Sequence, residues 1–341
     1  MRLALFALLL SIKATMVTGF EIEESRTYPD DGGIAMRILS TADADVFEPI
    51  IHAFQGDHPG ISIAYDVASS AQVMAAIFEE AADYDLVISS AMDLQTKLAN
   101  DGLARTYTSD ATAGLPAWAK WHDQIFAFTQ EPAVLVLNAQ DFATLGLPKN
   151  REDLITLLRD HADVFEGRIG TYDVRVSGLG YLFATQDSRN TESFWRLTEV
   201  MGRLKARLYC CSGDMIADVA SGRLALAYNV LGSYARARLA DTPGVLVVEM
   251  DDFVSVMLRT ALIPETAQNP VEAGMFIDFL SGMNTRPSLV AQTGLPPVAV
   301  GTTQDEAVIR PIRLGPGLLV FLDRMRRETF LRSWTSSIEQ D

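Results

Sequence analysis

Pairs of hydroxyl side chains follow three consecutive apolar segments in the first third of the sequence. The pairs are Ser40 and Thr41, Ser69 and Ser70, and Ser89 and Ser90. If the segments are parallel strands, the pairs share the carboxyl edge of one sheet, where ligands bind in open α/β folds. Each pair also precedes a helical pattern, and the free N–H groups of a helix N-terminus favour polar or anionic groups. Any single serine at such a position is best explained as a helix N-cap, but three pairs at equivalent positions favour a ligand-binding site at this edge of the sheet.

A second set of polar and aromatic residues lies at expected strand ends and loops in the middle of the chain. Arg175 is the best candidate to bind a carboxylate or phosphate, because its planar guanidinium donates two hydrogen bonds at once. A surface salt bridge is the alternative in so acidic a chain. Ser177 is either a helix cap or part of an anion site, and the tyrosines either contact a ligand or are half-buried in the core. The set comprises Tyr172, Arg175, Ser177, Ser212, Asn229, Ser233 and Tyr234.

The two cysteines, Cys210 and Cys211, are adjacent. Zinc sites need more ligands at wider spacing, and the four histidines form no metal-spaced motif, so we expect neither a metal nor a cofactor. In an oxidising compartment each cysteine has only the other as an intramolecular partner. One hypothesis is therefore a vicinal disulfide, or a pair of thiolates, that faces a ligand. The preferred alternative is two small buried residues that pack.

The elements that position these residues alternate between strand and helix. Such alternation predicts parallel sheets flanked by helices. Strands are expected at 36–39, 61–67, 84–88, 133–137, 223–229 and 245–250, and helices at 44–55, 71–82, 153–160, 193–204 and 270–280. A last amphipathic helix is expected at 317–338, with Arg324, Arg326, Arg327 and Arg332 on its exposed face.

The chain has 341 residues, which is long for a single hydrophobic core, and a formal charge of −16. This acidity counts against nucleic acid or an anionic membrane surface as a partner. Arg2, an apolar run at 3–10 and small residues at 14–19 are typical of a signal peptide, and the run is too short to span a bilayer. We therefore expect a cleaved signal peptide and a periplasmic, monomeric product.

The expected organisation has five parts. They are a signal peptide at 1–19, an N-terminal extension at 20–35, a first lobe at 36–130, a second lobe at 131–250, and a return to the first lobe with C-terminal helices at 251–341.

Seven stretches carry a family pattern through their order rather than through any single motif. They are 36–55, YDLVISS at 84–90, EPAVLVLN at 131–138, SGLGYLF at 177–183, VASGRLALAYN at 219–229, FIDFLSG at 276–282 and TGLPPV at 293–298. Together they resemble the periplasmic substrate-binding proteins of ABC transporters, in the branch that includes ferric-iron and phosphorylated-sugar binders. The resemblance implies a type II periplasmic-binding-protein fold: two α/β lobes, each a mainly parallel sheet flanked by helices, that close around a ligand in the cleft between them.

One departure bears on the ligand. The iron-binding members carry two adjacent tyrosines after the strand that matches 223–229, whereas Tyr234 stands alone here. Ferric iron is therefore disfavoured and kept only as an alternative. Hydroxyls, amides and backbone N–H groups better suit a small organic anion such as a carboxylate, a sugar phosphate or a phosphonate.

Three classes of function follow from these features. The first is a subunit that delivers its ligand to an ABC permease. The second is a sensor that presents its bound state to the periplasmic domain of a histidine kinase, because the segment 310–334 is similar to the ends of relatives associated with two-component signalling. The third is an enzyme, which is disfavoured because the sequence has no nucleophile-elbow motif and no metal-ligand set.

Overall fold

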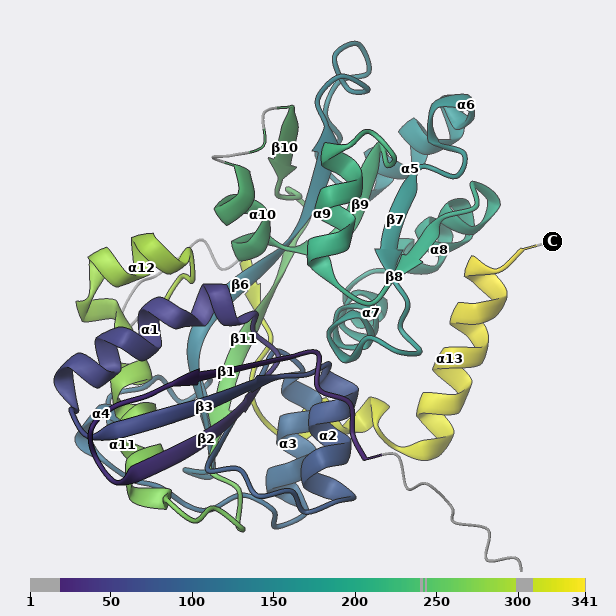
Figure 1. The fold of residues 1–341 in the computed structure, drawn as a ribbon. Helices are drawn as coiled ribbons and strands as arrows, with labels where there is room; N and C mark the ends of the chain where they lie inside the picture. The colour runs from purple at the N-terminus through teal and green to yellow at the C-terminus, as the bar shows by residue number, and fades with distance from the viewer. Residues whose placement is uncertain (1–18, 240–241, 243, 299–308, 341) are drawn as a thin grey trace, which may run out of the picture.

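Two long strands, β6 (Ile125–Asn138) and β11 (Val254–Leu262), run through both halves of the molecule. They pair with each other antiparallel, and Figure 1 shows them passing from the lower lobe into the upper one. The structure is a computed structural model and describes residues 19–239, 242, 244–298 and 309–340. Within that part, one sheet runs through both lobes in the order β1-β3-β2-β4-β11-β6-β9-β7-β8. The crossing strands and the two lobes confirm the type II fold inferred from the sequence.

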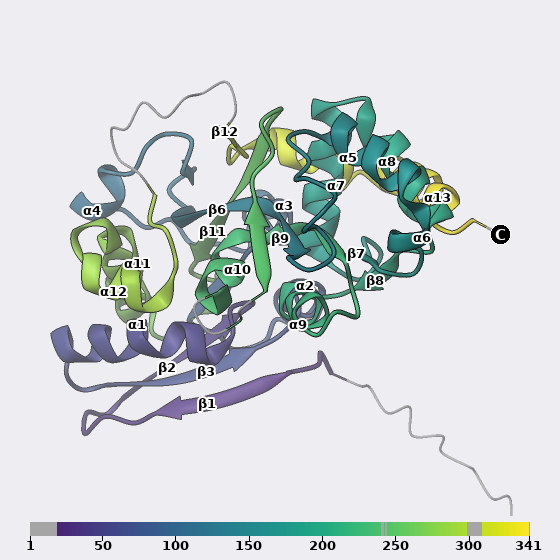
Figure 2. The same ribbon diagram turned by 90° about the horizontal axis from the view of Figure 1, so that it is seen from above.

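The first lobe is built on the predicted parallel strands. β2 pairs in parallel with both β3 and β4, while β1 adds an antiparallel outer strand against β3, as Figure 2 shows. The bounds of β3 agree with the prediction, since its alternating β-branched and aromatic residues suit a pleated strand. The elements are β1 (Glu24–Tyr28), β2 (Ile34–Ser40), α1 (Ala44–Asp57), β3 (Ile61–Val67), α2 (Ser70–Phe78), β4 (Leu86–Ser89), α3 (Met92–Asn100), α4 (Asp110–Ala113), β5 (Lys120–Trp121), α11 (Pro270–Ser281), η1 (Met283–Thr285) and α12 (Pro287–Thr293).

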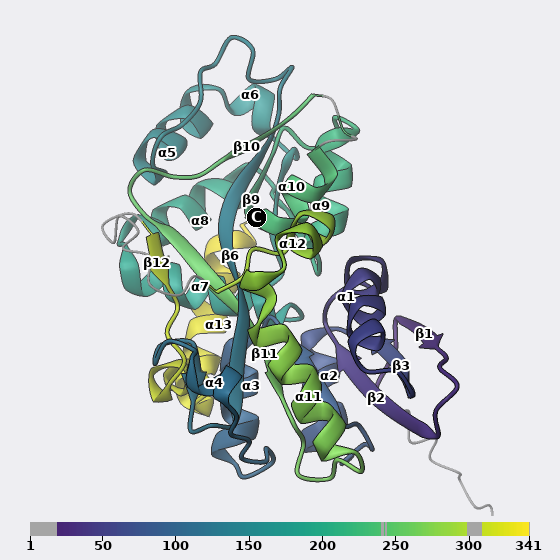
Figure 3. The ribbon, with the colours of Figure 1, turned by 90° about the vertical axis from the view of Figure 1, so that its left-hand side faces the viewer.

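The second lobe repeats this plan beyond the crossing strands. β7 pairs in parallel with β8 and β9, and β9 pairs antiparallel with the second half of β6. Figure 3 shows the second lobe above the first, with β6 and β11 running from one to the other. The elements of the second lobe are α5 (Arg151–Asp160), α6 (Ala162–Phe165), β7 (Ile169–Tyr172), α7 (Gly178–Asn190), α8 (Ser193–Arg203), β8 (Arg207–Tyr209), α9 (Ser212–Ala220), β9 (Leu226–Leu231), α10 (Gly232–Leu239) and β10 (Val245–Val248).

The C-terminal segment departs from the single helix predicted over 317–338. After β12 (Ile309–Pro311) it forms a short 3-10 helix, η2 (Pro316–Phe321), and then α13 (Arg324–Ile338). The break has a local cause, because the Asp323 side chain accepts a hydrogen bond from the backbone N–H of Arg326 at 3.1 Å and so caps a new helix. α13 packs against α8 of the second lobe through Phe330 and Trp334, and its predicted arginine face is exposed.

The predicted signal peptide lies outside the described residues except for Gly19. Among the described residues, no helix is both long and apolar enough to cross a membrane.

Asp93, buried in the first turn of α3, should make the stability of the protein depend on pH. Burial raises the pKa of Asp93 to about 7. Between pH 4 and 7 the carboxyl ionises in the unfolded chain but keeps its proton in the folded one, so stability falls as pH rises through this window. The difference between a pKa near 4 in the unfolded chain and one of about 7 in the folded protein corresponds to a loss of about 4 kcal/mol in the free energy of unfolding.

We therefore expect Asp93→Asn to unfold at a higher denaturant concentration than wild type at pH 8 and to match it at pH 4. Denaturant unfolding followed by circular dichroism across this range would measure the difference. Asp160→Asn, at the exposed end of α5, is the control and should keep the wild-type pH profile. Equal stabilities of Asp93→Asn and wild type at pH 8 would show that the Asp93 carboxylate carries no such penalty.

Candidate functional site

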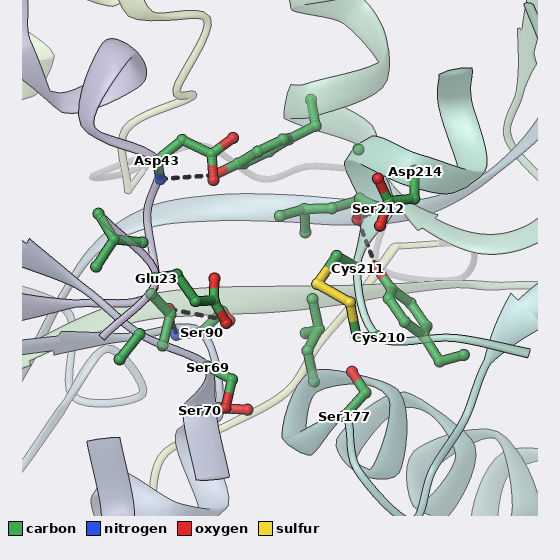
Figure 4. Close-up of a pocket in the computed structure, with 18 of the residues that line it drawn as sticks. Glu23, Asp43, Ser69, Ser70, Ser90, Ser177, Cys210, Cys211, Ser212 and Asp214 are labelled. Atoms are coloured by element: carbon green, nitrogen blue, oxygen red, sulfur yellow. Dashed lines mark hydrogen bonds between the residues drawn. A yellow bond between two sulfur atoms is a disulfide. The ribbon is translucent and has the colours of Figure 1, made fainter. Parts of the chain in front are cut away.

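A pocket of about 370 Å³ lies between the two lobes, where the carboxyl ends of the first lobe's strands face α7 and α9 (Figure 4). This volume is within the range of small-molecule sites. The pocket is lined by Glu23, Thr41, Asp43, Val67, Ala68, Ser69, Ser70, Ser90, Tyr172, Val176, Ser177, Leu179, Cys210, Cys211, Ser212, Gly213, Asp214, Ala217, Leu231, Tyr234 and Arg259.

The first lobe contributes four of its six predicted hydroxyl residues. They are Thr41, Ser69, Ser70 and Ser90. The Thr41 hydroxyl accepts a hydrogen bond from the Ser90 backbone N–H at 3.1 Å, which ties two strand ends together. Ser69 is both cap and lining residue, because its side chain accepts from the backbone N–H of Gln72 at the start of α2.

Ser40 and Ser89 do not line this pocket. Each is buried, and its hydroxyl accepts a hydrogen bond from the backbone N–H two residues further along the chain, at 3.0 Å and 3.1 Å respectively. Their hydroxyls therefore stabilise the turns after β2 and β4, and the prediction that they contact a ligand does not agree with their positions.

The second lobe contributes Tyr172, Ser177, Ser212 and Tyr234 from the predicted set. The Tyr172 and Ser212 hydroxyls are hydrogen-bonded to each other, and Ser212 also accepts from the Leu231 backbone N–H at 3.3 Å. Ser177 caps α7 by accepting from Gly180 at 3.1 Å. Burial raises the pKa of Tyr234 to about 12 and also raises that of Tyr172. Both phenols therefore keep their protons at neutral pH.

The remaining three predicted residues lie outside the pocket. Arg175 is exposed, and its guanidinium pairs with Asp173 at 2.8 Å and with Glu339. The salt-bridge alternative is therefore the one that agrees with its surroundings. Asn229 donates to the buried Asp187 at 2.8 Å, and Ser233 donates to Glu131 of β6, so both side chains belong to internal networks.

Arg259, which the sequence reasoning missed, lies on β11 and is one of the residues that line the pocket. Its side chain is 1% exposed and pairs with Glu131, with Nε 3.0 Å from Oε1 and Nη2 3.3 Å from Oε2. Burial lowers the pKa of Arg259, but Glu131 together with Tyr234 and Tyr65 outweighs burial and the net pKa is raised, so the charge is retained. Nη1 is buried without a hydrogen-bond partner among the described residues. A buried guanidinium N–H without a partner is costly, and an anionic oxygen in the pocket would satisfy it.

Two hydrogen bonds cross the pocket and hold the lobes together. The Gly178 backbone N–H, in the first turn of α7, donates to the Ser70 hydroxyl at 3.0 Å. The Asp43 backbone N–H, before α1, donates to the Tyr234 hydroxyl at 3.2 Å. The structure therefore represents a state in which the two lobes are in contact.

Cys210 and Cys211 are joined by a disulfide, and both line the pocket. Cys210 is exposed and Cys211 is half-buried, so they are not the two buried packing residues of the preferred alternative. They stand between β8 and α9, directly before Ser212. The disulfide therefore forms part of the second-lobe wall.

We expect iodoacetamide to label neither cysteine in the native, unreduced protein, since a disulfide has no thiolate to alkylate. After treatment with a small dithiol, without denaturant, both cysteines should be labelled because Cys210 is open to solvent. Peptide mass spectrometry reads both states. Labelling before reduction would show that the cysteines are free thiols.

The comparisons with known proteins agree with this geometry. A family model described as bacterial extracellular solute-binding protein matches residues 36–293, which is most of the chain. The chain belongs to this family. The solute-binding protein is 30% identical to the substrate binding protein of the ABC transporter from Agrobacterium tumefaciens, with a TM-score of 0.86 over 92% of this chain and 98% of that one. The resemblance drawn from the sequence is thereby confirmed, and the family places the protein outside the cytoplasm.

More distant structures share the fold of this solute-binding protein. Iron-bound HitA from Pseudomonas aeruginosa is 18% identical with a TM-score of 0.69, covering 89% of this chain and 99% of that one. AfuA from Actinobacillus pleuropneumoniae, with fructose-6-phosphate bound, is 15% identical with a TM-score of 0.71, covering 91% and 100%. At these identities the likeness concerns the fold alone. A search of curated protein sequences found no match.

Proposed function

We propose that this solute-binding protein captures a small organic ligand with an anionic group in the pocket between its lobes and delivers it to an ABC permease. The observation that carries the proposal is Arg259, a charged residue of the pocket lining whose buried Nη1 has no hydrogen-bond partner among the described residues. Around it, hydroxyls from both lobes supply further hydrogen-bonding groups, as in a site for a polar small molecule.

Ferric iron is a poorer fit to this pocket. Hard cations prefer several anionic oxygen ligands, yet the described residues contain no group of three or more His, Cys, Asp or Glu side chains able to hold a metal ion. Burial keeps Tyr172 and Tyr234 protonated, and the positive charge of Arg259 would repel a cation. These features favour an organic ligand over the iron alternative.

A thermal-shift screen of the protein from Phe20 onward tests the proposal. The panel holds carboxylates, sugar phosphates, phosphonates, amino acids, uncharged sugars and Fe(III). A ligand at 100 times its Kd should stabilise the folded state by about 2.7 kcal/mol, and we expect this from an organic compound with an anionic group. A shift with Fe(III) alone, or only with uncharged compounds, would contradict the proposal.

The sensor alternative stays a prediction from the C-terminal sequence, and no contact among the described residues favours it. Both roles require reversible binding, so we expect the bound compound to be recovered unchanged. Turnover of a bound compound would contradict this view of the protein as a binding subunit.

A further inference from the structure

The charges around the pocket are unbalanced for a ligand that is only an anion. Among the described residues, three carboxylates and one guanidinium line it: Glu23, Asp43, Asp214 and Arg259. The charge of Arg259 is already paired with Glu131, which is fully buried behind it. The lining therefore carries excess negative charge, and a purely anionic ligand would meet repulsion as well as one favourable contact.

Glu23 reaches the pocket because β1 extends the sheet of the first lobe. Its backbone N–H donates to the carbonyl of Val67, the last residue of β3, at 2.8 Å. This bond holds Glu23 at the carboxyl end of β3, beside Ser69. The N-terminal extension, for which no role was predicted, thus supplies an acidic group to the first-lobe wall.

Asp214 approaches from the opposite wall. It lies in the first turn of α9, two residues after Ser212 and three after Cys211. Figure 4 shows Glu23 and Asp43 on the first-lobe side, and Asp214 with Cys210–Cys211 on the second-lobe side. The pKa of Glu23 is raised by burial and by the neighbouring charges of Asp43, Glu21 and Asp214. Such mutual repulsion would be relieved by a cation between the walls.

We infer that the ligand is a small zwitterion, whose anionic group binds Nη1 of Arg259 and whose ammonium group lies between the carboxylates of Glu23 and Asp214. This inference rests on the proposed function and narrows its ligand class. The ammonium offsets the excess negative charge of the lining, and the anionic group satisfies the buried donor. A bound metal ion is a poorer source of the positive charge, because no metal-binding group of side chains is present in the described part of the chain.

Pairs of matched probes measure how much the ammonium group and the anionic group each contribute to binding. Isothermal titration with phosphoethanolamine and ethyl phosphate compares a phosphate ester that carries an ammonium group with one that does not. Titration with β-alanine and propionate makes the same comparison for a carboxylate. Glycerol 3-phosphate replaces the ammonium with hydroxyls, which carboxylates also bind. We expect at least one zwitterion to bind ten times more tightly than its matched anion, and more tightly than glycerol 3-phosphate. Equal or tighter binding of the simple anion or of the polyol would overturn this inference but leave the proposed function standing. If no probe binds, this inference is overturned, and the thermal-shift screen decides the proposed function.

Variants test the assignment of the carboxylates. Glu23→Gln and Asp214→Asn should each reduce the preference for the zwitterion at least threefold, while affinity for its matched anion is unchanged or increased. Asp160→Asn removes the same charge from the exposed end of α5, far from the lining, and should keep the wild-type preference. A preference that survives the double variant Glu23→Gln/Asp214→Asn would overturn the assignment.

Discussion

Arg259→Lys should lower the affinity for the ligand by at least 100-fold, which corresponds to about 2.7 kcal/mol. Nε and Nη2 of Arg259 are engaged by Glu131, and Nη1 is left without a hydrogen-bond partner among the described residues. Lysine keeps a positive charge beside the buried Glu131 but lacks the planar fork that serves two partners at once. The loss is of the size expected for a hydrogen bond to a charged group. Isothermal titration with the best compound from the screen measures it.

Arg175→Ala is the matched control for this experiment. Arg175 was the sequence-based candidate for the anion, but it is exposed and paired with Asp173 and Glu339. We expect its replacement to leave the affinity within twofold of wild type. A thermal melt of each variant checks folding, because an unpaired buried Glu131 would destabilise the protein. A folded Arg259→Lys protein that binds normally, or a large loss in Arg175→Ala, would contradict the assignment.

Gly178→Ala should prevent the lobes from closing and weaken ligand binding by at least tenfold. A Cβ at position 178 would lie 2.4 Å from Oγ and 3.0 Å from Cβ of Ser70, and 3.3 Å from Cβ of Ala91. The 2.4 Å distance is too short for non-bonded atoms and the 3.0 Å distance is tighter than most Cβ contacts, so Ser70, and with it α2, would have to move away from α7. Because a clamp binds its ligand from both sides, a wider gap removes contacts from one wall. Titration gives the loss in affinity, and small-angle X-ray scattering gives the separation of the lobes.

Two further variants show whether the clash is the cause. Gly56→Ala, at an exposed position of α1, adds the same methyl group where no atom lies within 4 Å, so it should bind as wild type does. Ser70→Gly in the Gly178→Ala background removes both of the closest atoms and should restore part of the affinity. Unchanged affinity and shape in Gly178→Ala would mean that the contact between α2 and α7 is absent when ligand is bound.

Local patterns in the sequence were enough to predict most of the elements. The alternating residues of 61–67 predicted β3 with its observed bounds, and the parallel pairing of β2, β3 and β4 followed from the alternation of strands with helices. The C-terminal helix was predicted less well, because its periodicity continues across Asp323 while the side chain of that residue caps a new helix. The periodicity of apolar residues shows which face of a helix is buried, but it does not show where one helix ends and the next begins.

The site was harder to predict because the partners that decide each role are distant in the chain. Arg175 meets Glu339 and Arg259 meets Glu131, and neither pairing can be read from neighbouring residues. Arg259 could nevertheless have been noticed in the sequence, because it is the one charged residue among the nine of β11. A charged side chain within a buried strand needs a partner or a ligand. The burial of the Ser40 hydroxyl depends on the backbone conformation of the turn after β2, and this conformation cannot be read from the sequence.

The most direct test of the central claim is a crystal structure of the protein with the best compound from the screen. We predict that the compound lies between the lobes, with an anionic oxygen at about 3 Å from Nη1 of Arg259 and further hydrogen bonds from hydroxyls of both lobes. A compound bound elsewhere, or one in the pocket that leaves Nη1 of Arg259 without a partner, would contradict the account.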